Sequence, residues 1–116
     1  MGFKIYKRDT VKFEVEGAEI EMVVQRLSAK YEMLIQNTIS RLQEKHGDKF
    51  YATEDFAELY AGMLSEIIVE LRGIDDLPKW ETKEELKEIL IQCGYDFLIS
   101  GVTAYNQSKE VADPKK

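Results

Sequence analysis

The stretch that decides the fold runs from Thr10 to Val24 and reads TVKFEVEGAEIEMVV. Apolar and polar residues alternate on both sides of Glu16-Gly17, a pattern that is typical of two strands joined by a two-residue turn. Such a turn needs positive φ angles, which a glycine at position 17 adopts readily. We therefore predict a β-hairpin over residues 10–24.

The turn also predicts which residues of the two strands face each other. A two-residue loop sets apolar residues opposite apolar ones, so that one face of the hairpin is apolar throughout. The same register opposes Glu14 and Glu19, and this like-charge pair costs roughly a few tenths of a kcal/mol. Burial of the apolar face should outweigh that cost. The predicted pairs are Val15–Ala18, Phe13–Ile20, Val11–Met22, Glu14–Glu19 and Lys12–Glu21.

A hairpin of two strands is only marginally stable in water. This one must therefore lie on helices, recruit the short segment Phe3-Lys4-Ile5-Tyr6, or pair with another chain. We expect the apolar face to lie on the second or third predicted helix. The sequence identifies no partner for the outer edges of the hairpin, which points to a binding or assembly protein.

Most of the chain after the hairpin has the spacing of amphipathic helices. Ser28 and Thr53 are good N-caps, and Thr82-Lys83-Glu84-Glu85 matches a capping box. Glycine commonly follows the end of a helix, as in His46-Gly47 and Arg72-Gly73. We predict an α+β fold, mostly α, with a single domain over residues 1–107 and a flexible tail over 108–116. The predicted helices cover residues 29–46, 54–72 and 83–107.

The third predicted helix contains two glycines, Gly94 and Gly101, two turns apart on the same side. Each costs up to about 1 kcal/mol relative to alanine in a helix. They indicate either a close approach of another backbone or a break near Gly94. The sequence leaves these alternatives open.

The composition is that of an ordinary globular domain and excludes several functions. The chain of 116 residues is 44% hydrophobic and 33% charged, with a net charge of −6. This charge argues against a nucleic-acid partner, which selects clustered Lys and Arg. No apolar run approaches the roughly 20 residues that a membrane span needs, and no secretory signal is visible. We expect a cytoplasmic protein, in the host cytoplasm if it is phage-encoded.

Residues that carry enzyme chemistry or bind metals are scarce. The only histidine, His46, and the only cysteine, Cys93, are too far apart in sequence for zinc-ligand spacing. We expect His46 on the surface at a helix end, and Cys93 in the core as a small apolar residue. Asp75-Asp76 lacks the regular ladder of oxygens that a calcium loop needs. We therefore predict no catalytic residues, no cofactor and no metal, and a protein that is not an enzyme.

Trp80 is the only tryptophan and lies in the linker between the second and third predicted helices, near Leu77. In one interpretation Ile74, Leu77 and Trp80 form a lid that folds back over the ends of those helices. In the other, Trp80 anchors a partner protein, since exposed tryptophans often dominate interfaces. Trp80 and Leu77 are therefore candidate partner-binding residues.

The third predicted helix carries more apolar surface than one stripe can bury, because Ile91, Tyr95 and Ile99 widen it. Either this helix is surrounded on several sides, or a second copy of the chain covers it. So small a domain has few elements with which to surround a helix, which favours the second copy. Ile91, Tyr95 and Ile99 are the remaining candidate partner-binding residues.

Two segments resemble a known family. The hairpin from Thr10 to Ile20, followed by an extended stretch into Leu27-Ser28, resembles the start of small phage tail assembly chaperones. Leu71-Arg72-Gly73-Ile74, followed by Trp80-Glu81 and an acidic helix start, is similar to their middle. The resemblance covers residues 10–107. It implies a non-enzymatic role: such proteins bind the tape measure protein, keep it soluble, and are displaced as tail tube subunits polymerise.

These observations favour an assembly or interaction protein that binds a helical partner such as a tape measure protein and forms a homo-oligomer. The alternative is a small bacterial or viral adaptor or regulatory domain that acts through oligomerisation. Neither hypothesis requires nucleic acid, a membrane or a cofactor.

Overall fold

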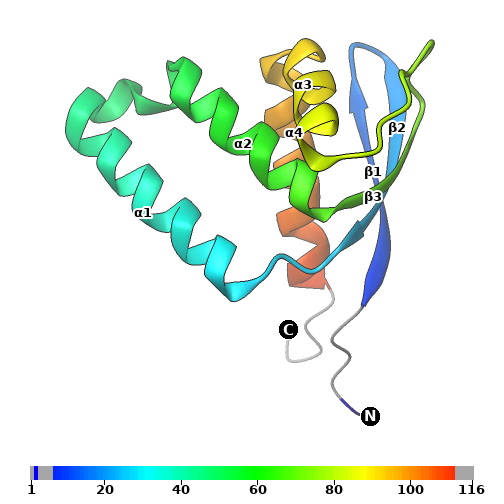
Figure 1. The fold of residues 1–116 in the computed structure, drawn as a ribbon, viewed down its shortest axis with the longest axis horizontal. Coiled ribbons are helices and arrows are strands. Elements are labelled where there is room, and N and C mark those ends of the chain that lie inside the picture. The colour runs from blue at the N-terminus through cyan, green and yellow to red at the C-terminus, as the bar shows by residue number, and fades with distance from the viewer. Residues whose placement is uncertain (1, 3–6, 112–116) are drawn as a thin grey trace.

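A three-stranded antiparallel sheet lies on one side of the molecule, and the helices lie on the other (Figure 1). The computed structural model describes residue 2 and residues 7–111, with side chains as far as residue 108. The predicted α+β, mostly α, class and the N-terminal hairpin are confirmed. The elements are β1 (Arg8–Val15), β2 (Ala18–Gln25), α1 (Ala29–His46), the 3-10 helix η1 (Gly47–Ala52), α2 (Glu54–Ile67), β3 (Ile68–Arg72), α3 (Lys83–Gln92) and α4 (Tyr95–Val111).

The hairpin has the predicted register at every pair. Glu16 and Gly17 both have positive φ, at 52° and 80°, and form the two-residue turn. All five predicted pairs are present, including Glu14 opposite Glu19. The side chains of Lys12 and Glu21 form an ion pair at 3.8 Å. The alternation of the sequence and one turn therefore determine this part of the sheet.

A third strand replaces the end of the second predicted helix. The helix expected over 54–72 ends at Ile67, and β3 pairs antiparallel with β2. The prediction of a longer helix was wrong because three buried residues also fit one apolar stripe of a helix. These residues are Ile67, Ile68 and Leu71. The β-branched pair Ile68-Val69 favours a strand once the edge of β2 offers hydrogen-bond partners. β3 is therefore the third strand of the sheet. The segment Phe3–Tyr6, which the sequence allows as an additional strand, lies outside the described residues.

The third predicted helix is two helices. α3 ends at Gln92, and Gly94 has φ of 94°, which a right-handed helix cannot contain. Gly101 is buried in α4, where an added Cβ would lie 3.2 Å from Leu64 Cδ1 and 3.6 Å from Phe13 Cζ. The break predicted as one alternative occurs at Gly94. At Gly101 the close neighbours are the side chains of Leu64 and Phe13 and not another backbone, so Gly101 allows side chains to pack closely on α4. α4 continues to Val111, past the predicted boundary at 107.

The core lies between the inner face of the sheet and helices α2, α3 and α4. α4 packs against β1, where the rings of Phe13 and Phe97 meet edge to face at 5.3 Å. α2 packs against α1, α3 and α4, so the helix surrounded on several sides is α2. The expectation that a helix covers the hairpin is met by α4, which is part of the third predicted helix. The largest fully buried side chains are Met22, Leu64, Ile67, Leu86, Leu90 and Leu98.

One buried hydrogen bond ties the linker before α1 to α4. The backbone N–H of Leu27 donates to the hydroxyl of Tyr105 over 3.1 Å, and both residues are buried. Tyr105→Phe removes the hydroxyl that accepts this hydrogen bond, and the buried N–H of Leu27 loses that acceptor. We expect the free energy of unfolding to fall by about 1–3 kcal/mol, measured by urea denaturation.

Tyr95→Phe is the matched control for that variant. The Tyr95 hydroxyl also makes one hydrogen bond, to the carbonyl oxygen of Tyr51 at 2.7 Å, but this bond is exposed to water. Its loss should cost less than about 0.5 kcal/mol. Equal stabilities for the two variants would contradict a structural role for the Leu27–Tyr105 bond.

Candidate partner-binding surfaces

Two of the predicted residues, Leu77 and Trp80, meet beside β3. Both are half-buried and pack against the core, as does Ile74. Packing against the core is what the lid interpretation expects, and partial exposure is compatible with the partner-anchor interpretation as well. Their outer surfaces line a shallow groove of 590 Å³ between β3 and the segment 77–81. The groove is lined by Val69, Glu70, Leu71, Arg72, Leu77, Pro78, Lys79, Trp80 and Glu81.

The other three predicted residues lie near the junction of α3 and α4. Ile91 and Tyr95 are 39% and 40% exposed, and Ile99 is half-buried. Tyr95 reaches η1 through its hydrogen bond to the Tyr51 carbonyl. The structure therefore divides the five candidates between two places, one beside β3 and the other near the junction of α3 and α4.

Beneath Tyr95 lies an aromatic cluster that the sequence did not predict. It consists of Phe50 and Tyr51 of η1 and Phe56 and Tyr60 of α2. Phe56 contacts Phe50 at 5.5 Å and Tyr60 at 4.3 Å between ring centroids. Burial, together with the neighbouring Tyr95, raises the pKa of Tyr60 above its ordinary value, so its hydroxyl is neutral at physiological pH. The cluster fixes the turn between α1 and α2. In the sequence, the two adjacent aromatic residues Phe50 and Tyr51 were the feature that could have indicated this cluster.

Helix α1 is the least buried of the long elements. Only Ile35 and Leu42 of its 18 residues are buried, while Met33 is 60% and Leu34 is 49% exposed. In Figure 1, α1 and η1 form the side of the molecule farthest from the sheet. Leu34 is thus an apolar residue that α1 leaves partly open to solvent.

A groove of 430 Å³ runs between α1 and α2, and we call it the α1–α2 groove. Its volume is within the range of ligand-sized clefts, about 300–1,000 Å³. Tyr31, Leu42 and Leu59 give it an apolar floor. Leu34 lies one helical turn before Thr38, a lining residue whose hydroxyl donates to the Leu34 carbonyl at 2.7 Å. Leu34 is not itself a lining residue, but helical spacing sets it on the same face of α1 as Tyr31 and Thr38, and it is 49% exposed.

The two walls of the α1–α2 groove carry opposite charges. Arg41 and Lys45 lie on α1, whereas Asp55 and Glu58 lie on α2. Lys87 of α3 pairs with Glu58 at 3.3 Å at the end of the groove. Within the described part of the chain, no ion pair joins Arg41 or Lys45 to the acidic wall. Arg41, Lys45 and Asp55 therefore remain open to an incoming ligand, whereas Glu58 is paired with Lys87.

A second groove, of 250 Å³, lies on the other flank of α1, against α2 and α4. It is lined by Leu27, Glu32, Ile35, Gln36, Ile39, Tyr60, Met63, Val102 and Asn106. Helix α1 thus stands between two grooves. The sequence could not predict them because they depend on how far the helices diverge.

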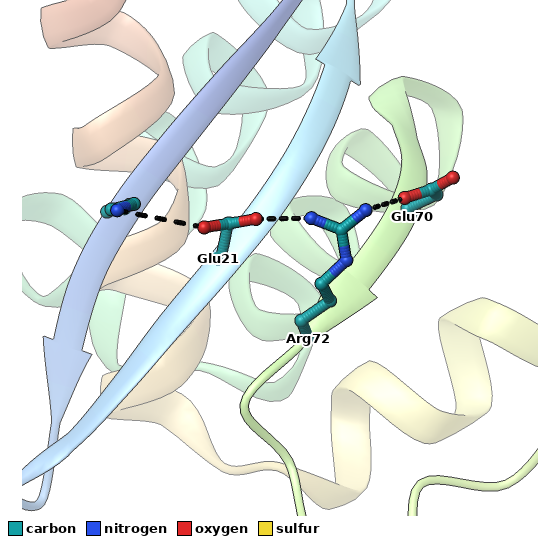
Figure 2. A network of polar contacts seen from close by, with 4 residues as sticks. Glu21, Glu70 and Arg72 are labelled. Atoms are coloured by element: carbon teal, nitrogen blue, oxygen red, sulfur yellow. Dashed lines mark hydrogen bonds and ion pairs between the residues drawn. The ribbon is translucent and has the colours of Figure 1, made fainter.

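The outer face of the sheet is polar. Arg72 of β3 binds Glu21 of β2 and Glu70 of its own strand, and Lys12 of β1 approaches Glu21 from the other side (Figure 2). These groups are accessible to water, and exposed ion pairs add little stability. Their role is to keep this face of the sheet hydrated. The apolar binding surfaces are therefore on the helices and beside β3.

The described residues contain no group of three or more His, Cys, Asp or Glu side chains able to hold a metal ion. Cys93 is half-buried and packs against the core, as predicted. Burial raises the pKa of its thiol, which stays protonated at neutral pH. Over the same residues, no helix has the length and apolar character needed to cross a membrane.

Comparison with known proteins provides no relative from which a function could be transferred. No protein-family model, curated protein or solved structure matches the chain.

Proposed function

We propose that this chain is a non-enzymatic binding protein that holds an apolar helical segment of a partner, in the manner of a phage tail assembly chaperone. The observation that carries the proposal is the α1–α2 groove, together with the exposed Leu34 on the same face of α1 as the lining residues Tyr31 and Thr38. An apolar floor between two helices is the usual receptor for the apolar face of a third helix. The resemblance of residues 10–107 to tail assembly chaperones supports a tape measure protein as the partner.

The charges of the groove define the chemistry of that partner. A bound helix would place its apolar residues on Tyr31, Leu42 and Leu59. Acidic residues on one flank would face Arg41 and Lys45, and basic residues on the other flank would face the acidic wall of α2. The partner segment is therefore an amphipathic helix with oppositely charged flanks. Such segments are exposed in a long helical protein before it assembles, which is when a chaperone is needed.

Gene order and co-purification test the identity of the partner. A tail assembly chaperone gene is expected between the genes of the major tail protein and the tape measure protein. We expect the neighbouring tape measure protein to be insoluble when expressed alone, and soluble and bound to this chain when the two are co-expressed. The absence of such a neighbour, or of a complex with it, would contradict the proposal.

Leu34→Asp tests the binding surface. Burying a leucine contributes about 1.5–3 kcal/mol, so the variant should weaken binding of the tape measure protein by about tenfold to a hundredfold. Leu34 is 49% exposed, so the melting temperature of the free chain should hardly change. Binding is measured by calorimetry or by co-purification yield.

Met33→Asp is the matched control for Leu34→Asp. Met33 is on the same helix and 60% exposed, but it lines neither groove and is not three or four residues from Tyr31 or Thr38, so it lies on another face of α1. The same substitution there should leave binding within about twofold, since it removes no groove contact. Equal losses in the two variants would show that binding depends on general surface hydrophobicity instead.

A second function is favoured by one observation. In the described part of the chain, β1 has a strand on one side only. An adaptor or regulatory domain that acts through oligomerisation could use this edge. That function predicts self-association without any affinity for a tape measure protein.

A further inference from the structure

The two edges of the sheet differ in how they are protected. β3 has five residues, its register with β2 shifts between Val23 and Val24, and the segment 77–81 lies beside it across the groove. β1 has eight residues, all paired with β2 without a shift. Over the described residues, no strand covers the other edge of β1.

β1 has only part of the protection that normally prevents edge strands from pairing with other chains. Such strands commonly carry charged side chains, a proline or a bulge. β1 has no proline and no register shift, and Val11, Phe13 and Val15 on its inner face are apolar, but it carries the charged residues Lys12 and Glu14. A long, regular edge of this kind is a template for another strand.

We propose that a second copy of this chain pairs with that edge. The two β1 strands run antiparallel about a two-fold axis at Phe13, so that two three-stranded sheets become one continuous sheet. This self-association is separate from the partner binding assigned to the α1–α2 groove, which lies on the far side of α2.

The hairpin geometry directs the required backbone groups outward. Val15 and Ala18 close the two-residue turn, so the backbone groups of Val15, and of every second residue before it, bond to β2. The N–H and C=O groups of Thr10, Lys12 and Glu14 consequently point to the open edge. They can form the hydrogen bonds of an antiparallel pair with the same residues of a second copy.

The charges select the register. With the axis at Phe13, Lys12 of each copy faces Glu14 of the other copy. The dimer therefore contains two equivalent pairs of opposite charge. An axis at Lys12 or at Glu14 would instead oppose two like charges. An axis at Val11 would pair Arg8 with Glu14, but it would also set the charged Asp9 against Phe13. The register with the axis at Phe13 is the one that pairs opposite charges without this mismatch.

Glu14→Lys tests the proposal, because it turns both attractive pairs into repulsive Lys–Lys pairs. We expect the wild-type chain to reach twice its 13.4 kDa mass in light scattering at low salt. The variant should raise the dimer dissociation constant by about tenfold or more. The variant also removes the Glu14–Glu19 repulsion within the hairpin. The monomer should therefore fold as stably as the wild-type monomer, so that a lost dimer cannot be explained by unfolding.

The double variant Lys12→Glu/Glu14→Lys exchanges the charges and should restore the dimer to within a few-fold of wild type. Glu19→Lys is the control, because it relieves the same repulsion on β2, away from the edge, and should leave the dimer unchanged. A wild-type chain that stays monomeric, an unchanged dimer in Glu14→Lys, or no rescue in the double variant would overturn the proposal. Leu34→Asp should not alter the dimer, so failure here is distinguishable from failure of partner binding.

Discussion

Gly73→Ala is expected to lower the free energy of unfolding by about 3 kcal/mol or more. Gly73 follows β3 with φ of 97°, a conformation that costs an alanine roughly 1–2 kcal/mol. An added Cβ would also lie under 3.0 Å from the carbonyl oxygen of Glu19 and 3.2 Å from Ile20 Cα. Both are backbone atoms of β2, so relief requires the end of β3 to move away from the sheet.

Gly94→Ala separates the two costs of that substitution. Gly94 has nearly the same φ, 94°, but an added Cβ there meets no atom within 4 Å. Gly94→Ala should therefore show only the conformational cost of about 1–2 kcal/mol. Urea denaturation of both variants measures the difference, and equal losses would contradict the close approach of Gly73 to β2.

Leu64→Ala is expected to cost about 2–5 kcal/mol, because it leaves a cavity at the centre of the core. Leu64 is fully buried on α2 and contacts the position of Gly101 on α4. Gly101→Val alone should cost about 1–3 kcal/mol by overpacking, since its Cβ already falls 3.2 Å from Leu64 Cδ1.

The double variant Leu64→Ala/Gly101→Val tests whether these two positions share one space. The valine methyl groups can enter the cavity that the missing leucine leaves, so the double variant should be more stable than the sum of the single losses predicts. We expect a coupling of at least about 1 kcal/mol. Simple additivity would contradict the packing of α4 on α2 through Gly101.

The hairpin could be predicted in full because its determinants are local. A two-residue turn and a period of two specify every pair from Val11–Met22 to Val15–Ala18. β3 could not be predicted in the same way. Its apolar residues continue the stripe of α2, and the choice of a strand depends on the edge of β2, more than 40 residues earlier in the chain.

The candidate binding residues were predicted only in part for the same reason. Leu77 and Trp80 do share one groove, since the linker that contains them is short. The α1–α2 groove was missed because it depends on the separation of two helices, which their individual patterns do not specify. Leu34 illustrates this limit: its spacing from Tyr31 and Leu42 fits one face of a helix, yet its side chain is 49% exposed.

Hydrogen–deuterium exchange of the chain, alone and in complex with the neighbouring tape measure protein, tests the proposed function most directly. We expect the amides of residues 31–45 of α1 and 55–62 of α2 to exchange more slowly in the complex, while those of the sheet stay unchanged. Unchanged exchange along α1, or protection confined to residues 77–81 beside β3, would contradict binding in the α1–α2 groove.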